Sequence, residues 1–396
     1  MRPSSRLSII YDRKEDHASV NGYRRPNFAT IHQDEQEYHG QIYFLSHVFD
    51  RENGMTLPVE SISANSFQGS RVVSVLIPRN VEVLEQGCFS KCLQLWHVSF
   101  ESDSRLKRIG PKAFLASSIE SITIPNHVTL LGCKCFCCCH SLTSVSFEKD
   151  SQLEWIGKRA FEKSDLKSIV IPEPVNSIGK NCFSECFSLV SVSFSPNARL
   201  VRIRSGAFAR SSLRSISIPR SVEILGSGCF LKCSSLRFVL FAEDARLIHT
   251  ESEAFRETSL KSIIIPKNAT SIGDNCFYFC RSLSSISFEP DSGLVTIGQK
   301  ACYFSAVKSI RIPRNVEVLD NECFCLCKNL TSITFEEGSQ LQRIGSEAFR
   351  SCNRLSFISI PGSVECIDEE AFLLCSCLED VHFEGGSRLR DIGQGA

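Results

Sequence analysis

Residues 133–140 read CKCFCCCH and place five cysteines and a histidine within eight positions. Thiolate and imidazole groups bind zinc, and clustered thiols also serve redox chemistry or accept acyl groups. The spacing lacks the two C-x2-C pairs that make a zinc prediction strong. What these side chains can do depends on the elements that hold them, and most of the chain around them is repetitive.

The composition is that of a folded, uncharged protein. The 396 residues include 44 basic and 44 acidic side chains and are 42% hydrophobic, so the net charge gives no argument for binding nucleic acid or an anionic membrane. The sequence contains no apolar run of the length that a secretory leader or a membrane helix needs. As it stands it predicts a cytoplasmic protein with reduced thiols, and a cell-surface protein if the sequence is incomplete.

A 47-residue period organises the chain. An apolar residue followed by proline recurs at a fixed interval, and a phenylalanine marks the middle of each period. The prolines are Pro78, Pro125, Pro172, Pro219, Pro266, Pro313 and Pro361, and the phenylalanines are Phe100, Phe147, Phe194, Phe241, Phe288, Phe335 and Phe383. Each period is two similar half-repeats, and a period this long is typical of a solenoid.

The half-repeats share one frame, in which I/L-x-x-x-A/C-F is followed by L-x-S-I/V-x-I/F. The second part alternates and is rich in β-branched residues, so it predicts a short strand. The first part, such as IGKRAF, predicts a helical turn or a second short strand, with its Ala or Cys and its Phe in the core. The prediction is a β-rich, leucine-rich-repeat-like solenoid with short helical turns, built of about 14 half-repeats of 23–24 residues over residues 62–396.

The two ends depart from the frame. Residues 1–61 are a polar, non-repeat segment, predicted to be partly disordered, with residues 41–49 as a candidate cap for the first turn. The C-terminal LRDIGQGA stops one residue before the next expected Phe. It predicts a solenoid that is truncated, or that leaves an uncapped edge able to pair with a partner.

The frame resembles the BspA-like, Treponema-type class of leucine-rich repeats. Residues 166–194, LKSIVIPEPVNSIGKNCFSECFSLVSVSF, match the pattern of that class closely, and the resemblance covers about 62–396. It implies a leucine-rich-repeat solenoid that binds proteins or surfaces, often as an adhesin or surface antigen. It implies no catalytic residue.

Most cysteines belong to two columns of the repeat. One column directly precedes the repeat Phe and alternates with Ala, and the other follows three residues after it and alternates with Ser or Thr, as at Cys182 and Cys186. A position that accepts Ala or Ser calls for a small buried side chain, although a disulfide within one turn stays an alternative. Within CKCFCCCH, only Cys133, Cys137 and Cys138 lie outside these columns, and we expect them to be surface thiols.

No constellation of catalytic residues recurs. The sequence contains no G-x-S-x-G, P-loop, H-E-x-x-H or dinucleotide fingerprint, and it predicts neither an enzyme nor a cofactor or metal site. Acidic turns such as FEKD and FEPD could bind Ca²⁺ through carboxylates. They alternate with basic residues after the prolines and lapse at Ser195 and Ala242, which favours charge pairing between neighbouring turns.

One outward strand position suggests a binding face. It is mostly Ser or Thr along the solenoid, but Leu240 and Ile264 occupy it on adjacent turns, with Phe238 beside them. Exposed apolar groups of this kind often mark interaction sites. Arg311 holds the same position further along. A second candidate group contains Trp96 and His97.

These observations predict a non-catalytic scaffold that presents a sheet face to a protein partner. A glycan or a host surface is an alternative partner, as for an adhesin of the same fold, and a thiol or metal-binding redox protein is a second alternative. We expect a monomer unless the open C-terminal edge pairs.

Overall fold

The computed structural model describes residues 29–31, 39–43, 47–50 and 55–396, with side chains from Pro58 onward. The chain divides into two compact units, Met1–Val175 and Asn176–Ala396, each described by itself. Among the described residues, no helix is long and apolar enough to cross a membrane.

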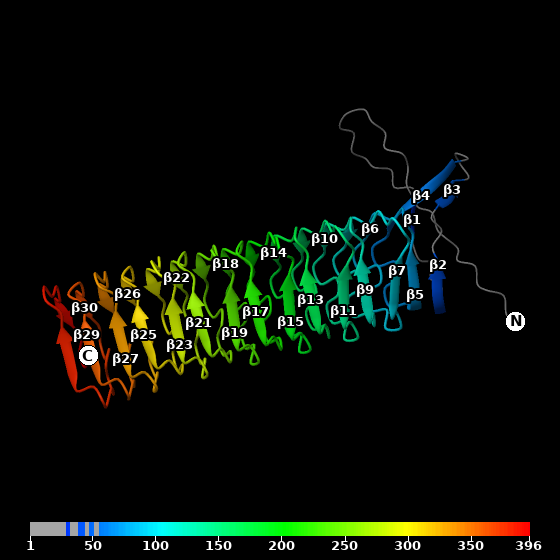
Figure 1. Ribbon diagram of the computed structural model, residues 1–396. Coiled ribbons are helices and arrows are strands. Elements are labelled where there is room, and N and C mark those ends of the chain that lie inside the picture. Colours follow the sequence, from blue (N-terminus) through cyan, green and yellow to red (C-terminus); the bar gives the residue numbers. More distant parts are fainter. Residues whose placement is uncertain (1–28, 32–38, 44–46, 51–54) are drawn as a thin grey trace. The chain divides into compact units, whose positions relative to one another are not determined.

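Each turn of the first unit contributes one strand to each of two parallel sheets (Figure 1). The odd-numbered strands from β5 onward, called the long strands, pair with one another, and the two-residue strands, called the short strands, pair likewise. The strands of this unit are β1 (Ala29–Ile31), β2 (His39–Tyr43), β3 (His47–Asp50), β4 (Met55–Ile62), β5 (Arg71–Ile77), β6 (Val83–Leu84), β7 (His97–Phe100), β8 (Arg108–Ile109), β9 (Ser121–Ile124), β10 (Leu130–Leu131), β11 (Ser144–Phe147), β12 (Trp155–Ile156) and β13 (Ser168–Ile171).

The second unit repeats this plan with parallel pairing. Its long strands are β15 (Ser191–Phe194), β17 (Ser215–Ile218), β19 (Phe238–Phe241), β21 (Ser262–Ile265), β23 (Ser285–Phe288), β25 (Ser309–Ile312), β27 (Ser332–Phe335), β29 (Phe357–Ile360) and β31 (Asp380–Phe383). These long strands pair in separate groups, β17 with β19, β21 through β27, and β29 with β31. Its short strands are β14 (Ser177–Ile178), β16 (Arg202–Ile203), β18 (Ile224–Leu225), β20 (His249–Thr250), β22 (Ser271–Ile272), β24 (Thr296–Ile297), β26 (Val318–Leu319), β28 (Arg343–Ile344), β30 (Cys366–Ile367) and β32 (Asp391–Ile392).

The segment around the repeat Phe is neither helix nor strand, and the described residues contain no helix. The prediction of short helical turns is therefore wrong. Backbone φ is positive two residues before and two residues after the Phe, as at Asn181 and Glu185. The N–H groups of Asn181, Phe183 and Glu185 donate to carbonyl oxygens of the next turn at 2.9, 2.7 and 2.8 Å. These bonds between turns offset the 1–2 kcal/mol or so that a left-handed residue costs.

The repeat phenylalanines form a ladder through the core of each unit. In the first unit Phe67, Phe89, Phe114, Phe136 and Phe161 stack with ring centroids 5.3–5.5 Å apart. In the second unit the stack runs from Phe183 through Phe208, Phe230 and Phe255 to Phe277, and resumes from Phe324 through Phe349 to Phe372. Between these runs, buried Cys302 stands where the frame has Phe. The predicted inward direction of the Ala or Cys and of the Phe is confirmed.

Both ends of the described repeat carry strands or side chains outside the regular stack. β2 pairs in parallel with β5, and β3 pairs antiparallel with β4, so parts of the candidate cap 41–49 lie beside the first turns. At the other end, Phe383 of β31 and Ile392 of β32 are exposed. Of the segment 1–61 that was predicted to be partly disordered, residues 1–28, 32–38, 44–46 and 51–54 lie outside the described residues. Both the cap and the uncapped C-terminal edge stay predictions.

The phenylalanine ladder generates the first prediction. Phe208 contacts a stacked ring on each side, so Phe208→Ala removes both contacts and should lower the free energy of unfolding by about 3–5 kcal/mol. Urea denaturation followed by circular dichroism measures this change. Phe187, whose side chain is 64% exposed, gives the control Phe187→Ala, for which we expect almost no change. Equal losses for the two variants would contradict the packing role of the ladder.

Candidate binding face

The long strands of each unit present one row of alternating side chains to solvent, called the sheet face. In β15, Ser191 and Ser193 are exposed while Val192 between them is buried, and the same alternation recurs along the long strands. Serine is the commonest residue at these outward positions. It provides a low, flat surface on which any larger side chain projects.

Phe238, Leu240 and Ile264 break this serine surface and together form the apolar cluster. Their side chains are 45%, 60% and 58% exposed. Strands β19 and β21 are neighbours, and Lys261 N donates to Arg237 O at 3.2 Å just before them. Leu240 and Ile264 therefore occupy one column on consecutive turns. The Lys261 ammonium lies 5.9 Å from the centre of the Phe238 ring and adds a cationic border.

The other predicted binding residues do not belong to the apolar cluster. Arg311 is exposed in β25, in the same column two turns beyond Ile264, with Nε 4.0 Å from Glu336 Oε1. Trp96 and His97 belong to the first unit, where both are exposed and their rings lie 5.3 Å apart. The structure thus brings together the three apolar residues, while Arg311 stands alone on β25 and Trp96 contacts His97 in the first unit.

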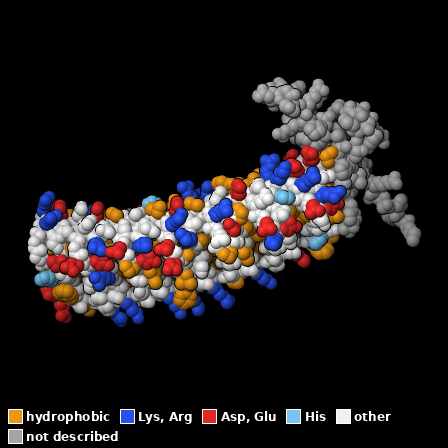
Figure 2. Space-filling view, turned by 45° about the horizontal axis from the view of Figure 1, so that its top comes forward, with side chains coloured by type: hydrophobic (Ala, Val, Ile, Leu, Met, Phe, Trp, Pro, Cys, Tyr) orange, Lys and Arg blue, Asp and Glu red, His pale blue; other side chains and the backbone are white. Residues whose placement is uncertain are grey.

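A groove lies beside the apolar cluster in the second unit, a feature that the sequence did not reveal. It has a volume of about 1150 Å³ and follows the carboxyl ends of β15, β17 and β19 with the loops after them. Its lining combines outward serines and Leu240 with Arg199, Arg220 and Arg246, and Glu223 is the only acidic residue in it. Figure 2 shows acidic and basic side chains side by side along part of this unit, and hydrophobic side chains beside Lys and Arg elsewhere on that face.

A cluster of half-buried aromatic rings also escaped the sequence analysis. Tyr278 stacks on Tyr303 at 5.0 Å and Phe279 on Phe304 at 4.8 Å, and the Arg281 guanidinium lies just over 5 Å from the two phenylalanine rings. Most copies of the repeat carry other residue types at these two positions after the core Phe. The aromatic residues at these two positions were the sign in the sequence from which the cluster could have been predicted. The four rings and the Arg281 guanidinium make their stacking and cation–π contacts with one another, which indicates that the cluster has a structural role.

The comparisons with known proteins agree with this geometry. The sequence pattern of the BspA type leucine rich repeat region, in 6 copies, matches residues 60–190, 154–284 and 248–379. The chain belongs to this BspA-type leucine-rich-repeat family. Its structure is a parallel β-solenoid of about 14 turns, as the sequence predicted.

Solved structures of bacterial leucine-rich-repeat proteins are similar to this BspA-type protein. A leucine-rich repeat protein from Bacteroides ovatus is 27% identical with a TM-score of 0.71, over 98% of this chain and 90% of that chain. A leucine rich cell surface protein from Faecalibacterium prausnitzii is 23% identical with a TM-score of 0.45, over 93% and 96%. The pneumococcal vaccine antigen PcpA is 19% identical with a TM-score of 0.42, over 95% and 98%. No curated protein matches the chain.

Most cysteines of this BspA-type protein, 16 of the 21, are buried as side chains of the core. None of the 21, all of which lie among the described residues, forms a disulfide bond. In the second column the thiol also makes a hydrogen bond to the previous turn, as Cys233 Sγ donates to Phe208 O at 3.0 Å and lies 3.4 Å from Ser211 Oγ. Burial raises the pKa of Cys233, and likewise of Cys280, to about 11, although the neighbouring hydroxyl lowers it. These thiols keep their protons at neutral pH.

The predicted surface thiols behave differently from one another. Cys133 is exposed and Cys138 is half-buried, but Cys137 is only 4% exposed, so its assignment to the surface was wrong. The residue directly after the core Phe lies against the neighbouring turn, where Cys137 Sγ is 3.6 Å from Glu162 Oε2. Burial is the main cause that raises the pKa of the Cys137 thiol, and the neighbouring Cys138 and Glu162 raise it further.

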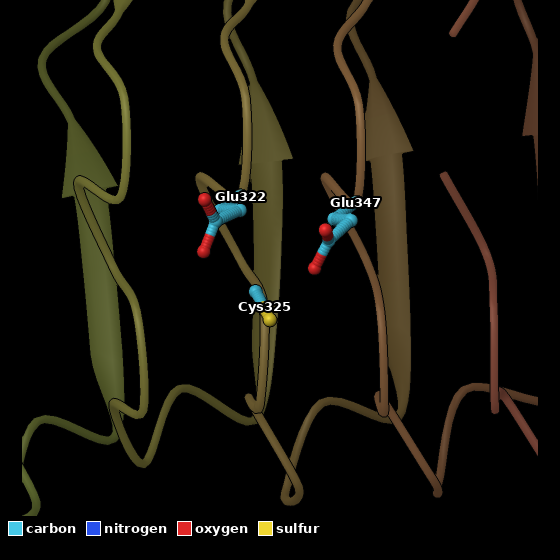
Figure 3. Close-up of side chains that lie close together, drawn as sticks. All are labelled: Glu322, Cys325 and Glu347. Atoms are coloured by element: carbon cyan, nitrogen blue, oxygen red, sulfur yellow. The ribbon is translucent and has the colours of Figure 1, made fainter. Parts of the chain in front are cut away.

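Glu322, Cys325 and Glu347 form one group of possible metal ligands, with their ligand atoms within 4.8 Å of one another (Figure 3). Both carboxylates already have cationic partners. Glu322 lies 3.2 Å from Lys300 Nζ, and Glu347 lies 2.9 Å from Arg350 Nη1. Burial together with these two acids raises the pKa of Cys325 to about 12, so the thiol is protonated at neutral pH. The group is better explained as a charge network than as a metal site.

One histidine lies beside a hydroxyl group, the pair that a nucleophilic mechanism would need. His249 Nδ1 is 3.2 Å from Ser271 Oγ and 3.4 Å from Thr270 Oγ1, on an exposed part of β20 and β22. Among the described residues no carboxylate contacts the His249 ring. The arrangement therefore lacks the third group that orients a catalytic imidazole.

Burial predicts which thiols are modified. In the native protein at pH 7.5, iodoacetamide should label Cys133 and Cys377 first, because both are exposed, while Cys137, Cys229 and Cys276 react only after unfolding in urea. Peptide mass spectrometry at increasing times measures the order. Labelling of Cys137 as fast as Cys133 would show that the turn containing it is open.

The raised thiol pKa values predict loss of stability at alkaline pH. Below the ordinary thiol pKa of about 9.0 both the folded and the unfolded chain hold the proton, and between about 9 and 11 only the folded chain does. The free energy of unfolding should therefore fall with rising pH, by up to about 1.4 kcal/mol per pH unit for each such thiol. Urea denaturation at several pH values measures the slope.

Cys280→Ser is the matched variant, because Ser or Thr holds this column in other turns, as Ser211 and Thr258 do. Its slope above pH 9 should be shallower than that of the unchanged protein. Equal slopes would mean that the Cys280 thiol ionises as readily in the folded chain as in the unfolded one.

Proposed function

We propose that this protein is a non-catalytic scaffold whose sheet face binds a partner protein through the apolar cluster. The observation that carries the proposal is the set of three large apolar side chains, Phe238, Leu240 and Ile264, exposed together on a surface of serines. Solvent-exposed apolar groups of this size gain free energy when a partner covers them, at about 25 cal/mol per Å².

The character of the apolar cluster favours a protein partner. Aromatic and aliphatic anchors surrounded by polar residues resemble the centre of a protein interface, where a few side chains supply most of the binding energy. Lys261 and the serines of β17 and β23 would form the polar border. The fold supports this use, because the regular stacking of turns holds the long strands rigidly before any partner arrives.

The adhesin prediction uses the same face. An adhesin differs from an intracellular scaffold in the location of its partner, not in the contacts described above. The variants that test the scaffold therefore test the adhesin as well.

The proposal predicts that Leu240→Asp combined with Ile264→Asp abolishes partner capture without unfolding the protein. Two carboxylates in the apolar cluster would have to lose water when a partner covers them, which costs several kcal/mol. Affinity purification with mass spectrometry compares the proteins retained by each form, and thermal unfolding checks the fold.

Ser332→Asp combined with Thr334→Asp is the control, because both are exposed outward residues of β27, three turns beyond Ile264. It adds the same charge to the sheet face outside the apolar cluster and should retain the partner. Loss of the same proteins in both double variants would contradict binding at the apolar cluster, and unfolding of the first variant would show that Leu240 and Ile264 are core residues.

A further inference from the structure

A carboxylate network along the loops after the long strands has one interruption. In both units a glutamate after the long strand accepts a hydrogen bond from the backbone N–H that follows the proline of the previous turn. The bonds are Glu101 Oε2 with Arg79 N at 3.0 Å, Glu148 with Asn126 N at 3.0 Å, Glu289 with Lys267 N at 2.9 Å and Glu336 with Arg314 N at 3.1 Å. Ser195 and Ala242 hold this position in the two copies between them.

The same edge carries ion pairs that stop at the same place. Arg314 Nη2 lies 2.9 Å from Asp291 Oδ1, and Lys267 Nζ lies 3.7 Å from Asp244 Oδ1. Arg220 is the equivalent residue of the preceding proline half-repeat. The aspartate that would pair with it is Asn197 in this sequence, and the glutamate is Ala242.

Arg220 has therefore lost both of the acidic partners that its counterparts have. Among the residues that the structure describes, no carboxylate lies within 4.0 Å of the Arg220 or the Arg246 guanidinium, and both residues are exposed. Arg246 N donates to Arg220 O at 3.0 Å, which places the two residues on adjacent turns. Small polar residues, among them Ser193 and Ser217, line the groove beside them.

These two arginines line the groove described above, together with Arg199 and one acid, Glu223. The lining thus carries a net formal charge of two positive. Leu240 lines the same groove and also belongs to the apolar cluster. Cationic and apolar surfaces are therefore continuous at this point of the sheet face.

We propose that this groove binds an acidic segment of the partner protein, in which one or two carboxylates lie next to an apolar side chain. The proposal rests on the function proposed above and assigns the chemistry of its partner. The apolar side chain would pack on Leu240 and Ile264, and the carboxylates would take the two guanidinium groups of Arg220 and Arg246 in place of the missing acids. Arginine suits this role because its planar group bonds carboxylates at two points.

The extent of the positive region favours a peptide over a polyanion. Arg220 and Arg246, the two arginines of the groove without a carboxylate partner, lie on only two successive turns. On the following turns, Lys267 and Arg314 form ion pairs with Asp244 and Asp291, so their positive charge is neutralised. A nucleic acid or sulfated polysaccharide binds through a longer track of unpaired cations.

The test measures fluorescence anisotropy with labelled peptides on the full chain. The probe peptide carries two leucines followed by three glutamates, and its matched control carries three glutamines instead. We expect the glutamate peptide to bind at least about 10-fold more tightly, and its affinity to fall as salt rises. Equal binding of the two peptides, or binding of neither, would overturn the proposal, as would tighter binding of a heparin-derived oligosaccharide or a single-stranded oligonucleotide.

Arg220→Ser combined with Arg246→Ser should weaken binding of the glutamate peptide by about 10-fold, the effect of two partly exposed charge pairs. Arg314→Ser is the matched control, because Arg314 holds the equivalent position with its acids in place, and it should change the affinity less than about 2-fold. An equal loss in both would mean that general charge attracts the peptide, and would overturn the assignment of the groove.

The two proposals can fail separately. If Leu240→Asp with Ile264→Asp abolishes partner capture while the arginine double variant retains it, the apolar cluster binds the partner and the acidic segment is refuted. If both variants retain the partner, both proposals are wrong. If both lose it and the glutamate peptide competes with the partner, both stand.

Discussion

Each turn of this protein is held by its neighbours through backbone hydrogen bonds at three places: the long strands, the short strands and the segment around the repeat Phe. The hydrogen bonds around the repeat Phe are the unusual ones, because they require residues with positive φ on both sides of the Phe. They fix the height of each turn, and the phenylalanine rings then stack 5.3–5.6 Å apart. The regular outward rows of the sheet face follow from this stacking, since identical turns place equivalent side chains in columns.

Recurrence explains how much could be predicted from the sequence. The core columns were predictable because each position is sampled about fourteen times, so that Cys182 and Phe183 could be compared with their counterparts in every turn. The turn around the Phe was not predicted, because Gly or Asn holds the left-handed position before the Phe in only six turns, and Lys, Arg or Glu, which have no preference for positive φ, hold it in the others. Cys137 was wrongly predicted to be a surface thiol for a related reason, since its side chain lies against Glu162 of the adjacent turn.

The candidate sites are departures from the repeat, and they differed in how visible they were. The apolar cluster stood out in the sequence because Leu240 and Ile264 replace serine in a single column. The groove did not, because it depends on which loops meet: Arg220 faces the positions of Asn197 and Ala242 only once the turns are stacked. Single losses of an acid at distant places in the sequence thus combine into one positive surface in space.

The missing phenylalanine at Cys302 bears on how the second unit comes apart. In a solenoid, cooperativity passes only between adjacent turns, so the weakest junction decides where an unfolding boundary stops. The core ring stack ends at Phe277 and resumes at Phe324, but the outer pairs Tyr278–Tyr303 and Phe279–Phe304 stack across the turns where it is broken. A force that separates the turns at Cys302 therefore has to break these outer ring contacts, so the substitution in the core does not by itself make this junction the weakest.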